Sequence, residues 1–347
     1  MAAYDVTFHP RWWHQRTGVC FNERFFTDAA YRIEADLTMR RYLQNSFGAC
    51  LIDDGPLVPR PLLDSDLLAG EYLQAALLGC DVLFSDDNLP EVICANLTDE
   101  QVLRLQPPDL DANPLWLSYE KQLQTLLEKH SRVECYLDLY GVQNLAFALR
   151  GQALFFDYYD QPDLADHLLD VCAQTLIAVA QKLRRYTSNI SGGVSSVIQK
   201  TMPSAYLTSN CTVDMISPEL YEEFLLPWDK KLARHFPPFA VHHCGAHCER
   251  FAALYCTIPN LSWLEAGAFS DFAAVRRTCG NLSLNLRYSP RDLLQKSPSE
   301  IERDVKNAFA ATVCNGSSAC TSMSCVGVDP QTPDENVTAF CRAVSAV

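Results

Sequence analysis

The densest group of metal-binding residue types in the chain is the segment VHHCGAHC at positions 241–248. His242 and Cys244 follow directly on an apolar run that predicts a strand, and residues two apart on a strand point to the same side. An imidazole and a thiolate on one side are ligands that suit zinc. Because two ligands do not complete a catalytic zinc site, we expect a third from a distant part of the chain.

Cys325 is the residue that we expect to supply this third ligand. It lies in the last predicted strand, which would close a barrel by lying beside the first. Cys314 and Cys320 are its rivals, in a stretch whose Gly and Ser content is typical of a loop. Cys211 follows another predicted strand and is interpreted as a buried structural thiol that could line the pocket.

Three further residues of the 241–248 segment are spare ligands by proximity. The alternation of a strand predicts that His243 points away from the metal or supports one of its ligands. His247 and Cys248 are expected to begin the next helix instead of binding zinc.

Asp86 and Glu265 are the candidate catalytic residues, because each follows or ends a predicted strand. Asp86 could orient a substrate or the outer nitrogen of a zinc ligand, against the alternative of an acid that caps a turn. Glu265 could act as a base or support a ligand, against the alternative of an exposed turn residue. The pair Trp12-Trp13 could cover a barrel mouth, although packing of an N-terminal helix is the simpler interpretation.

Short apolar runs alternate with amphipathic stretches along most of the chain. Eight strands alternating with helices predict an α/β protein with a (β/α)8 TIM barrel at 76–347, preceded by a mostly helical N-terminal extension at 1–75. A doubly wound sheet is the alternative, but no Gly-rich phosphate turn follows the first predicted strand. The predicted strands are 82–84, 133–139, 152–156, 205–208, 239–242, 261–264, 282–286 and 322–326. The predicted helices are 29–42, 64–78, 114–130, 143–149, 162–186, 218–235, 248–255, 271–279 and 299–311.

The charge and the apolar content of the chain exclude several classes of partner. A net charge of −14 argues against nucleic acid, which is bound through clustered Lys and Arg, and against anionic membranes. No apolar run approaches the ~20 residues of a spanning helix, and the N-terminus has no signal pattern. We therefore expect a cytoplasmic location, in which the 15 cysteines are mostly reduced. So many reduced thiols weakly indicate an anaerobic host.

Four segments together are more specific than any one of them. They are SPELYEEFLLPW at 217–228, HHCG at 242–245, Cys325 followed by TPDEN at 332–336, and FSD at 84–86. This combination resembles the uroporphyrinogen decarboxylase-like superfamily, and in particular its zinc-containing, corrinoid-dependent methyltransferase branch. The resemblance implies a barrel whose site lies at the carboxyl ends of the strands, with zinc held by His242, Cys244 and Cys325. It also implies a methyl group carried by a separate corrinoid (cobalamin) protein and a zinc-activated thiol such as coenzyme M.

Two departures bear on the substrate that the resemblance implies. The decarboxylase branch carries two arginines in an N-terminal RQAGRY element, whereas the comparable segment here is QRTGV at 15–19 and lacks the second arginine. The family's GN-x-D-P strand end is replaced by NLRYSP at 285–290. The first departure argues against decarboxylation of a substrate rich in carboxylates, and the second weakens any transfer of substrate identity.

We therefore predict an enzyme, a zinc-dependent methyltransferase that moves a methyl group between a corrinoid protein and a small acceptor, here a zinc-bound thiol. One alternative is a demethylase that passes a methyl group from a methoxyl, methylamine or methylthio donor to Co(I). The others are a decarboxylase and a non-catalytic barrel that binds zinc or a corrinoid. A homodimer is compatible with the sequence, and neither a nucleic acid nor a membrane partner is expected.

Overall fold

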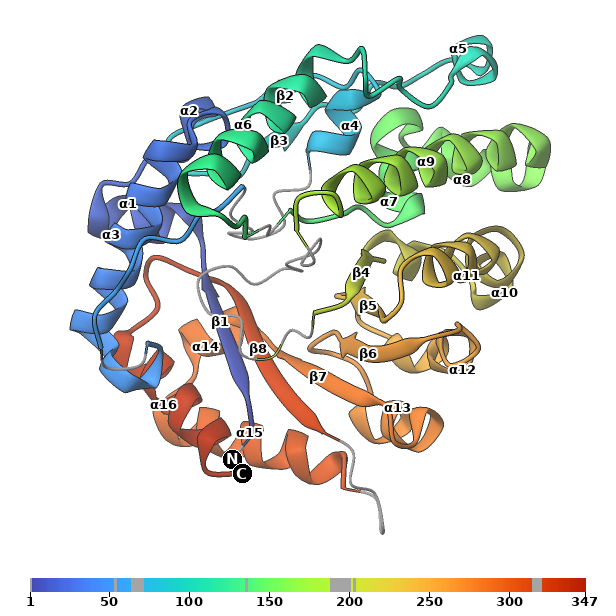
Figure 1. Cartoon of the computed structure of the whole chain (residues 1–347). Coiled ribbons are helices and arrows are strands. Elements are labelled where there is room, and N and C mark those ends of the chain that lie inside the picture. The colour runs from blue at the N-terminus through green and yellow to red at the C-terminus, as the bar shows by residue number, and fades with distance from the viewer. Residues whose placement is uncertain are drawn as a thin grey trace.

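A curved, parallel, six-stranded sheet forms the centre of the computed structural model, which describes residues 2–52, 55–63, 72–134, 137–187, 201, 204–313 and 320–347 (Figure 1). The strand order is β1-β8-β7-β6-β5-β4, and every neighbouring pair is parallel. The strands are β1 (Tyr4–Phe8), β4 (Tyr206–Ser209), β5 (Phe239–His243), β6 (Leu261–Ala266), β7 (Ser283–Tyr288) and β8 (Thr321–Val328).

Two isolated parallel bridges continue the sheet beyond β4. Tyr140 bridges Ser209 of β4, and Leu62 bridges Glu134. A curved parallel sheet of six strands with further parallel bridges, covered by helices, is an arrangement of the TIM-barrel class. The predicted α/β fold of the TIM-barrel class, with a mostly helical N-terminal region, is confirmed.

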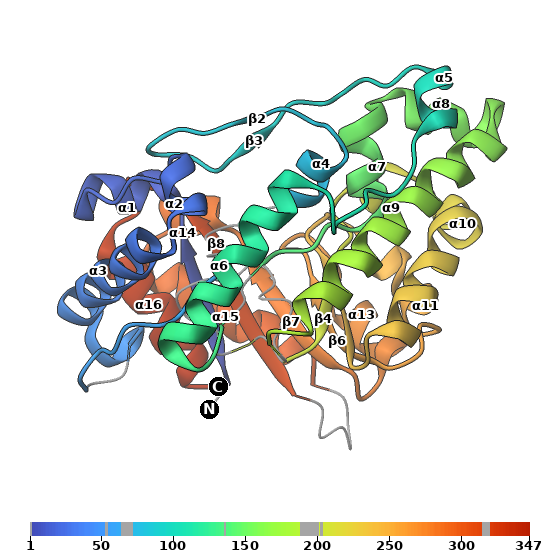
Figure 2. The same ribbon diagram turned by 45° about the horizontal axis from the view of Figure 1, so that its top comes forward.

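Helices cover the outer side of the sheet, as Figures 1 and 2 show. The N-terminal region contributes α1 (Pro10–Thr17), α2 (Glu23–Thr27) and α3 (Ala29–Phe47). The middle of the chain forms α4 (Leu73–Leu77), α5 (Asp99–Arg104), α6 (Pro114–His130), α7 (Val142–Arg150), α8 (Ala153–Asp160) and α9 (Pro162–Leu183). The remaining helices are α10 (Pro218–Leu220), α11 (Leu226–His235), α12 (Ala252–Tyr255), α13 (Phe272–Cys279), α14 (Pro290–Gln295), α15 (Pro298–Ala311) and α16 (Asp334–Ser345).

The helix starts follow the local rules that the sequence shows. Asp28 caps α3, its side chain accepting hydrogen bonds from the amides of Ala30 and Tyr31. Proline occupies the first turn of α9 and α10, where a missing N–H costs nothing. Asp271 caps α13 through the amide of Ala274. These helix starts are therefore encoded locally.

One predicted strand lies in a different sheet, and another is wrong. Residues 82–84 do not begin the parallel sheet: β2 (Val82–Leu83) pairs antiparallel with β3 (Glu91–Val92) in a separate two-stranded sheet. Figure 2 shows this hairpin as a long ribbon between the N-terminal helices and α5. Residues 152–156 begin α8, because a short apolar run of this kind fits a buried strand and one face of a helix equally well.

The first strand of the sheet was missed by sequence reasoning. All five residues of β1 are buried, but its sequence YDVTF alternates apolar and polar residues, so a signal for a strand was present in the sequence. Of the predicted strand at 133–139, residues 135–136 lie outside the described residues. Among the others, Glu134 forms an isolated bridge with Leu62, and no regular strand is present. Residues 64–71 of a predicted helix also lie outside them, and α4 covers the end of that prediction.

The helices predicted at 218–235 and 248–255 are each interrupted. In the first, a π-helical turn at Tyr221–Leu225 separates α10 from α11, and in the second a 3-10 turn at Cys248–Arg250 precedes α12. In the part of the chain that the structure describes, no helix combines the length and the apolar character that crossing a membrane demands.

Candidate metal centre

Three metal-binding side chains meet at the carboxyl ends of β4 and β5. The ligand atoms of Cys211, His242 and Cys244 all lie within 4.8 Å of one another. The register of the parallel pair brings them together, because Ser209 lies opposite His242 and the amide of Asn210 donates to the His242 carbonyl at 2.8 Å. The chain leaving β4 therefore delivers Cys211 to the end of β5, where His242 and Cys244 lie two residues apart.

Cys325, the predicted third ligand, is not part of this cluster. On β8, the hydroxyls of Ser322 and Ser324 contact Asn285 and Glu265, and strand alternation directs Cys325 to the opposite face. Its register neighbour on β7 is Tyr288, whose ring packs against Phe340 of α16 on the helix side of the sheet. Burial raises the pKa of the Cys325 thiol to about 12, as expected for a core residue.

Cys211 occupies the third position that the sequence analysis assigned to Cys325. It was interpreted as a structural thiol, although a signal was available: it follows the strand that precedes β5, at the end where a barrel places its site. The two rivals lie elsewhere. Cys314 is outside the described residues, and Cys320 is an exposed residue that precedes β8, at the amino end of that strand.

Glu265 of β6 holds the imidazole of His242. The two residues face each other in register, and Nδ1 of His242 donates a hydrogen bond to Oε2 of Glu265. This bond leaves Nε2 of His242 for a metal, in the carboxylate–histidine–metal arrangement that orients ligands in many zinc sites. Glu265 was predicted as a catalytic residue or a support for a ligand, and its recorded contacts are those of a support.

The Glu265 carboxylate is buried but fully partnered. Its Oε1 accepts hydrogen bonds from Nη1 of Arg287 at 2.8 Å, Oγ of Ser324 at 3.1 Å and Nδ2 of Asn285 at 3.2 Å. Burial by itself raises the pKa of this carboxyl, but Arg287 and His242 together hold it below its usual range. Glu265 therefore remains ionised and retains its hydrogen bond with His242.

The two cysteines of the cluster contact each other. A hydrogen bond from Cys211, followed by the nearby charges of His242 and Arg287, lowers the pKa of Cys244. Burial lowers the pKa of His242, but the Glu265 carboxylate outweighs burial and raises it. These surroundings favour the thiolate form of Cys244, which is the form that binds a metal.

Two glycines allow the Cys244 loop to pack against the end of β6. A Cβ added to Gly267 would lie 1.9 Å from the carbonyl oxygen of Gly245, and one added to Gly245 would lie 2.6 Å from Cβ of Asp214. Any side chain at either position would push the loop away from its neighbours. This close approach is the structural reason for the glycine that follows Cys244.

A buried acid supports the turn that carries Cys211. Oδ2 of Asp229 on α11 accepts hydrogen bonds from Nδ2 of Asn210 at 2.8 Å and from the Tyr221 hydroxyl at 2.6 Å. Burial raises the pKa of Asp229 to about 6, although these two donors oppose that shift. Because Asn210 precedes Cys211, the acid helps to determine where the Cys211 thiol lies.

The spare ligands of the 241–248 segment lie as predicted. Nδ1 of His243 contacts the hydroxyl of Tyr255 on α12 at 2.8 Å, so its ring points away from the cluster. His247 is exposed beside Glu249, and Cys248 is buried where the 3-10 turn begins.

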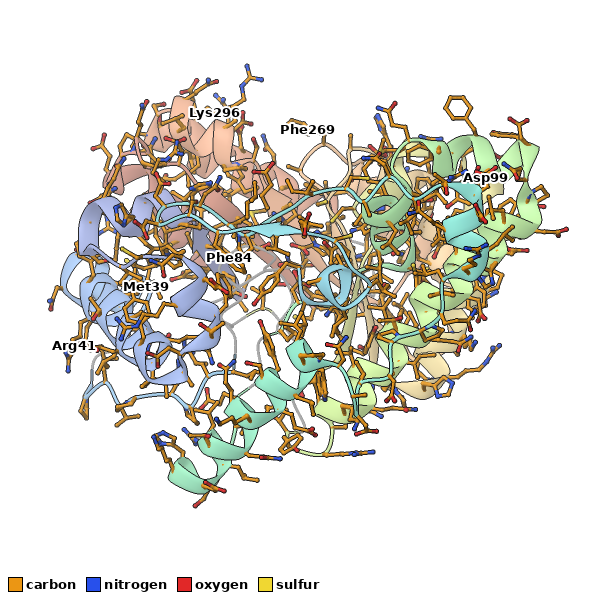
Figure 3. The ribbon with its side chains drawn as sticks, turned by 90° about the horizontal axis from the view of Figure 1, so that it is seen from above. Met39, Arg41, Phe84, Asp99, Phe269 and Lys296 are labelled. Atoms are coloured by element: carbon orange, nitrogen blue, oxygen red, sulfur yellow. The ribbon has the colours of Figure 1, made fainter. Side chains whose placement is uncertain are left out.

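The structure places Asp86 with the N-terminal segment. It is exposed, and its Oδ1 accepts a hydrogen bond from Nδ2 of Asn22 at 2.6 Å. Phe84, of the same FSD segment, packs against Phe26 and Tyr72, near the middle of the view from above in Figure 3. None of these recorded partners belongs to the metal cluster.

The Trp12-Trp13 pair belongs to the hydrophobic core. Both rings are buried, and both pack against Phe8 of β1. The simpler of the two interpretations, packing of an N-terminal helix on the barrel, is confirmed.

Comparison with known protein families identifies the chain. The sequence profile described as uroporphyrinogen decarboxylase (URO-D) matches residues 67–347. The chain belongs to the URO-D family. No curated protein sequence matches this URO-D family member.

Two solved structures are similar to this URO-D family member. One is described as a methyltransferase from Methanosarcina mazei, with a TM-score of 0.63 and 15% identity, covering 99% of this chain and 92% of that one. The other is a B12-independent methionine synthase from Shewanella sp. W3-18-1, with a TM-score of 0.41 and 10% identity, covering 65% of this chain and 66% of that one. At 15% identity the first likeness shows the fold alone, and it agrees with the resemblance of the sequence to the methyltransferase branch.

The residues of the cluster fit a zinc ion. Two thiols and one imidazole are the donor types that zinc prefers, and three protein ligands are the number that a catalytic zinc site uses. The bond between Glu265 and Nδ1 of His242 supplies the support that such a site needs.

Proposed function

We propose that this protein is a zinc-dependent methyltransferase whose metal is held by Cys211, His242 and Cys244. The observation that carries the proposal is the convergence of these three side chains at the carboxyl ends of β4 and β5, where barrel enzymes place their sites. Cys244 is exposed to solvent, so a small molecule can approach the cluster.

Zinc bound at this cluster would supply one kind of chemistry, the deprotonation of a thiol that binds beside the protein ligands. A thiol whose pKa is near 8.5 is mostly protonated at pH 7 and is a weak nucleophile. The protein residues keep the cluster in place: Glu265 orients the imidazole of His242, and Arg287 keeps Glu265 charged. The resulting thiolate acceptor would take a methyl group from methyl-Co(III) and leave Co(I).

The methyl donor in this proposal is a separate corrinoid protein. Exposed apolar side chains near the cluster support the docking of a partner. Met215, which ends the turn after Cys211, is 59% exposed, and Phe269, which follows Gly267, is 69% exposed. Phe269 lies at the rim of the molecule in Figure 3.

Decarboxylation of a substrate rich in carboxylates is less well supported. Arg287, a cation beside the cluster, donates to Glu265. Two arginines of the N-terminal region are also paired, Arg11 with Asp87 and Arg16 with Asp334. Arginines that already hold carboxylates of the protein have less capacity to grip those of a substrate.

The proposal is tested by a methyl-transfer assay on zinc-loaded protein prepared without oxygen. Methylcobalamin replaces the partner protein, coenzyme M is the thiol, and the spectrum of the corrinoid reports the loss of its methyl group. We expect transfer by the unaltered chain, none by Cys244→Ser, and transfer by the control Cys325→Ser. A zinc-loaded chain that transfers no methyl group, or a Cys244→Ser variant as active as the unaltered chain, would contradict the proposal.

A further inference from the structure

A second pair of thiols lies at the other end of the sheet. Cys256 follows α12, Cys279 ends α13, and their sulfur atoms are 3.3 Å apart. Neither cysteine takes part in a disulfide. Cys256 is exposed, whereas Cys279 is only 9% exposed, so one sulfur faces solvent and its partner lies behind it.

A cavity of about 500 Å³ opens at this pair. It lies between the amino ends of β6 and β7, since Leu261 and Ser283 begin those strands and line it. The rest of its wall carries no charged side chain. It is formed by the polar residues Asn260, Ser262 and Asn281 and the apolar residues Ile258 and Leu282. A polar molecule about the size of a short peptide can therefore reach the Cys256 sulfur.

The surroundings of this pair differ from those of a metal site. Among the residues that the structure describes, the group of three side chains suited to a metal is the Cys211, His242 and Cys244 cluster. Two neighbouring thiols with no third ligand are better suited to forming a bond with each other, because their sulfur atoms at 3.3 Å are already close to the ~2.05 Å of a disulfide.

We propose that Cys256 and Cys279 form a thiol-modification site that reacts with low-molecular-weight disulfides and closes into an intramolecular disulfide. The Cys256 thiolate attacks one sulfur of the reagent, whose S–S bond breaks and releases one thiolate. The Cys279 thiolate then attacks Cys256, the mixed disulfide breaks, and the second reagent thiolate leaves. The two released thiolates take up the two protons that the cysteines lose, so the pair is oxidised by two electrons and the reagent is reduced.

The electrostatics of the pair agree with this order of events. The neighbouring Cys279 thiol lowers the pKa of Cys256 through a hydrogen bond, whereas the same contact and burial raise the pKa of Cys279. The exposed cysteine is therefore the one that attacks first. Cys279 becomes the resolving thiol once Cys256 has reacted.

The site is independent of the proposed methyltransferase activity. Its cysteines lie at the ends of α12 and α13, whereas the metal cluster lies at the carboxyl ends of β4 and β5. A disulfide here would tie α12 to α13 across β6 and leave the ligands in place.

Peptide mapping of the zinc-loaded full chain treated with oxidised glutathione tests the proposal. We expect a Cys256–Cys279 cross-linked peptide and a loss of two hydrogens from the pair. Cys279→Ser should stop at a stable glutathione adduct on Cys256, and Cys256→Ser should leave Cys279 unmodified. The control Cys320→Ser removes an exposed cysteine that does not belong to the pair and should leave the cross-link unchanged.

The rate of reaction supplies a second measurement. In Cys279→Ser, Cys256 should react with glutathione disulfide at least about 10-fold faster than Cys320 does, because its cavity admits the reagent and a thiolate is the attacking species. The proposal is overturned if Cys256 remains reduced while Cys320 reacts, or if glutathione stays on Cys256 of the unaltered chain without a cross-link.

Discussion

The two thiol pairs of this protein lie at opposite ends of one parallel sheet and differ in what surrounds them. At the carboxyl ends, Cys211 and Cys244 share their surroundings with the imidazole of His242. At the amino ends, Cys256 and Cys279 lie 3.3 Å apart beside an uncharged cavity. In both pairs, a hydrogen bond from one thiol lowers the pKa of the other, so the closeness of two sulfur atoms does not distinguish a metal site from a redox site.

The imidazole of His242 and the buried groups that support the cluster make the difference. His242 is oriented by Glu265, and the Cys211 turn is supported by Asp229 through Asn210. Cys256 and Cys279, by contrast, are surrounded by asparagine, serine and aliphatic side chains. A pair of thiols is thus expected to hold zinc where fixed charges and an imidazole complete the site, and to react with disulfides where they do not.

The largest effect on zinc affinity is expected from replacing the cysteines of the metal cluster, with the cysteines of the other pair as a comparison. Cys211→Ser and Cys244→Ser should each lower the zinc affinity by more than about 100-fold, because a ligand is lost. Cys256→Ser, Cys279→Ser and Cys325→Ser should leave it unchanged. Competition against a chromophoric chelator measures the affinity, and loss of zinc from Cys325→Ser would restore the sequence-based choice of the third ligand.

A pH-dependent loss of stability is expected from Asp229. Its pKa is raised to about 6 in the folded protein, above the ~4 of an unfolded chain, so the folded state holds the proton more tightly. Stability from this group is therefore present below pH ~4 and is lost as the pH rises through about 6, by on the order of 3 kcal/mol.

Urea unfolding of the metal-free chain at a series of pH values between 4 and 7 measures this effect. Asp229→Asn should flatten the fall in stability relative to the unaltered chain. Tyr221→Phe removes a donor that lowers the pKa of Asp229, so the fall should move to higher pH. Identical pH profiles for the unaltered chain and Asp229→Asn would show that Asp229 does not titrate in this way.

A smaller effect is expected from the residue that orients His242. Glu265→Gln should lower the zinc affinity by about 10- to 100-fold, since a weaker acceptor holds the imidazole less firmly. Glu249→Gln is the matched control, because Glu249 contacts Nδ1 of the exposed His247 at 3.3 Å. Equal losses of zinc affinity in the two variants would contradict the specific role of Glu265.

Much of the site could be predicted from residue types alone. His242 and Cys244 were identified by their spacing at a strand end, and Glu265 by its place at the end of the next strand. The alternation of β5 also predicted that His243 faces away from the cluster, as its contact with Tyr255 shows. These inferences succeed because each one uses a single strand, whose side chains alternate between its two faces.

The fold was predicted as a class, but several of its elements were not. The parallel strands from β4 to β8 appear at their expected places, since each is a short apolar run bounded by turns. β1 was missed although its sequence YDVTF alternates apolar and polar residues. Residues 152–156 were taken for a strand because a short apolar run fits a strand and one face of a helix equally well.

What the sequence by itself determined is the α/β class, the family resemblance and the pair His242 and Cys244. The tertiary structure decided which further thiol lies beside this pair. A shift of one residue along a strand moves a side chain to the other face of the sheet, so Ser324 faces the site and Cys325 faces the helices. Cys211 joins the cluster because the register of β4 against β5 places its turn beside His242. No local pattern encodes that contact between distant segments.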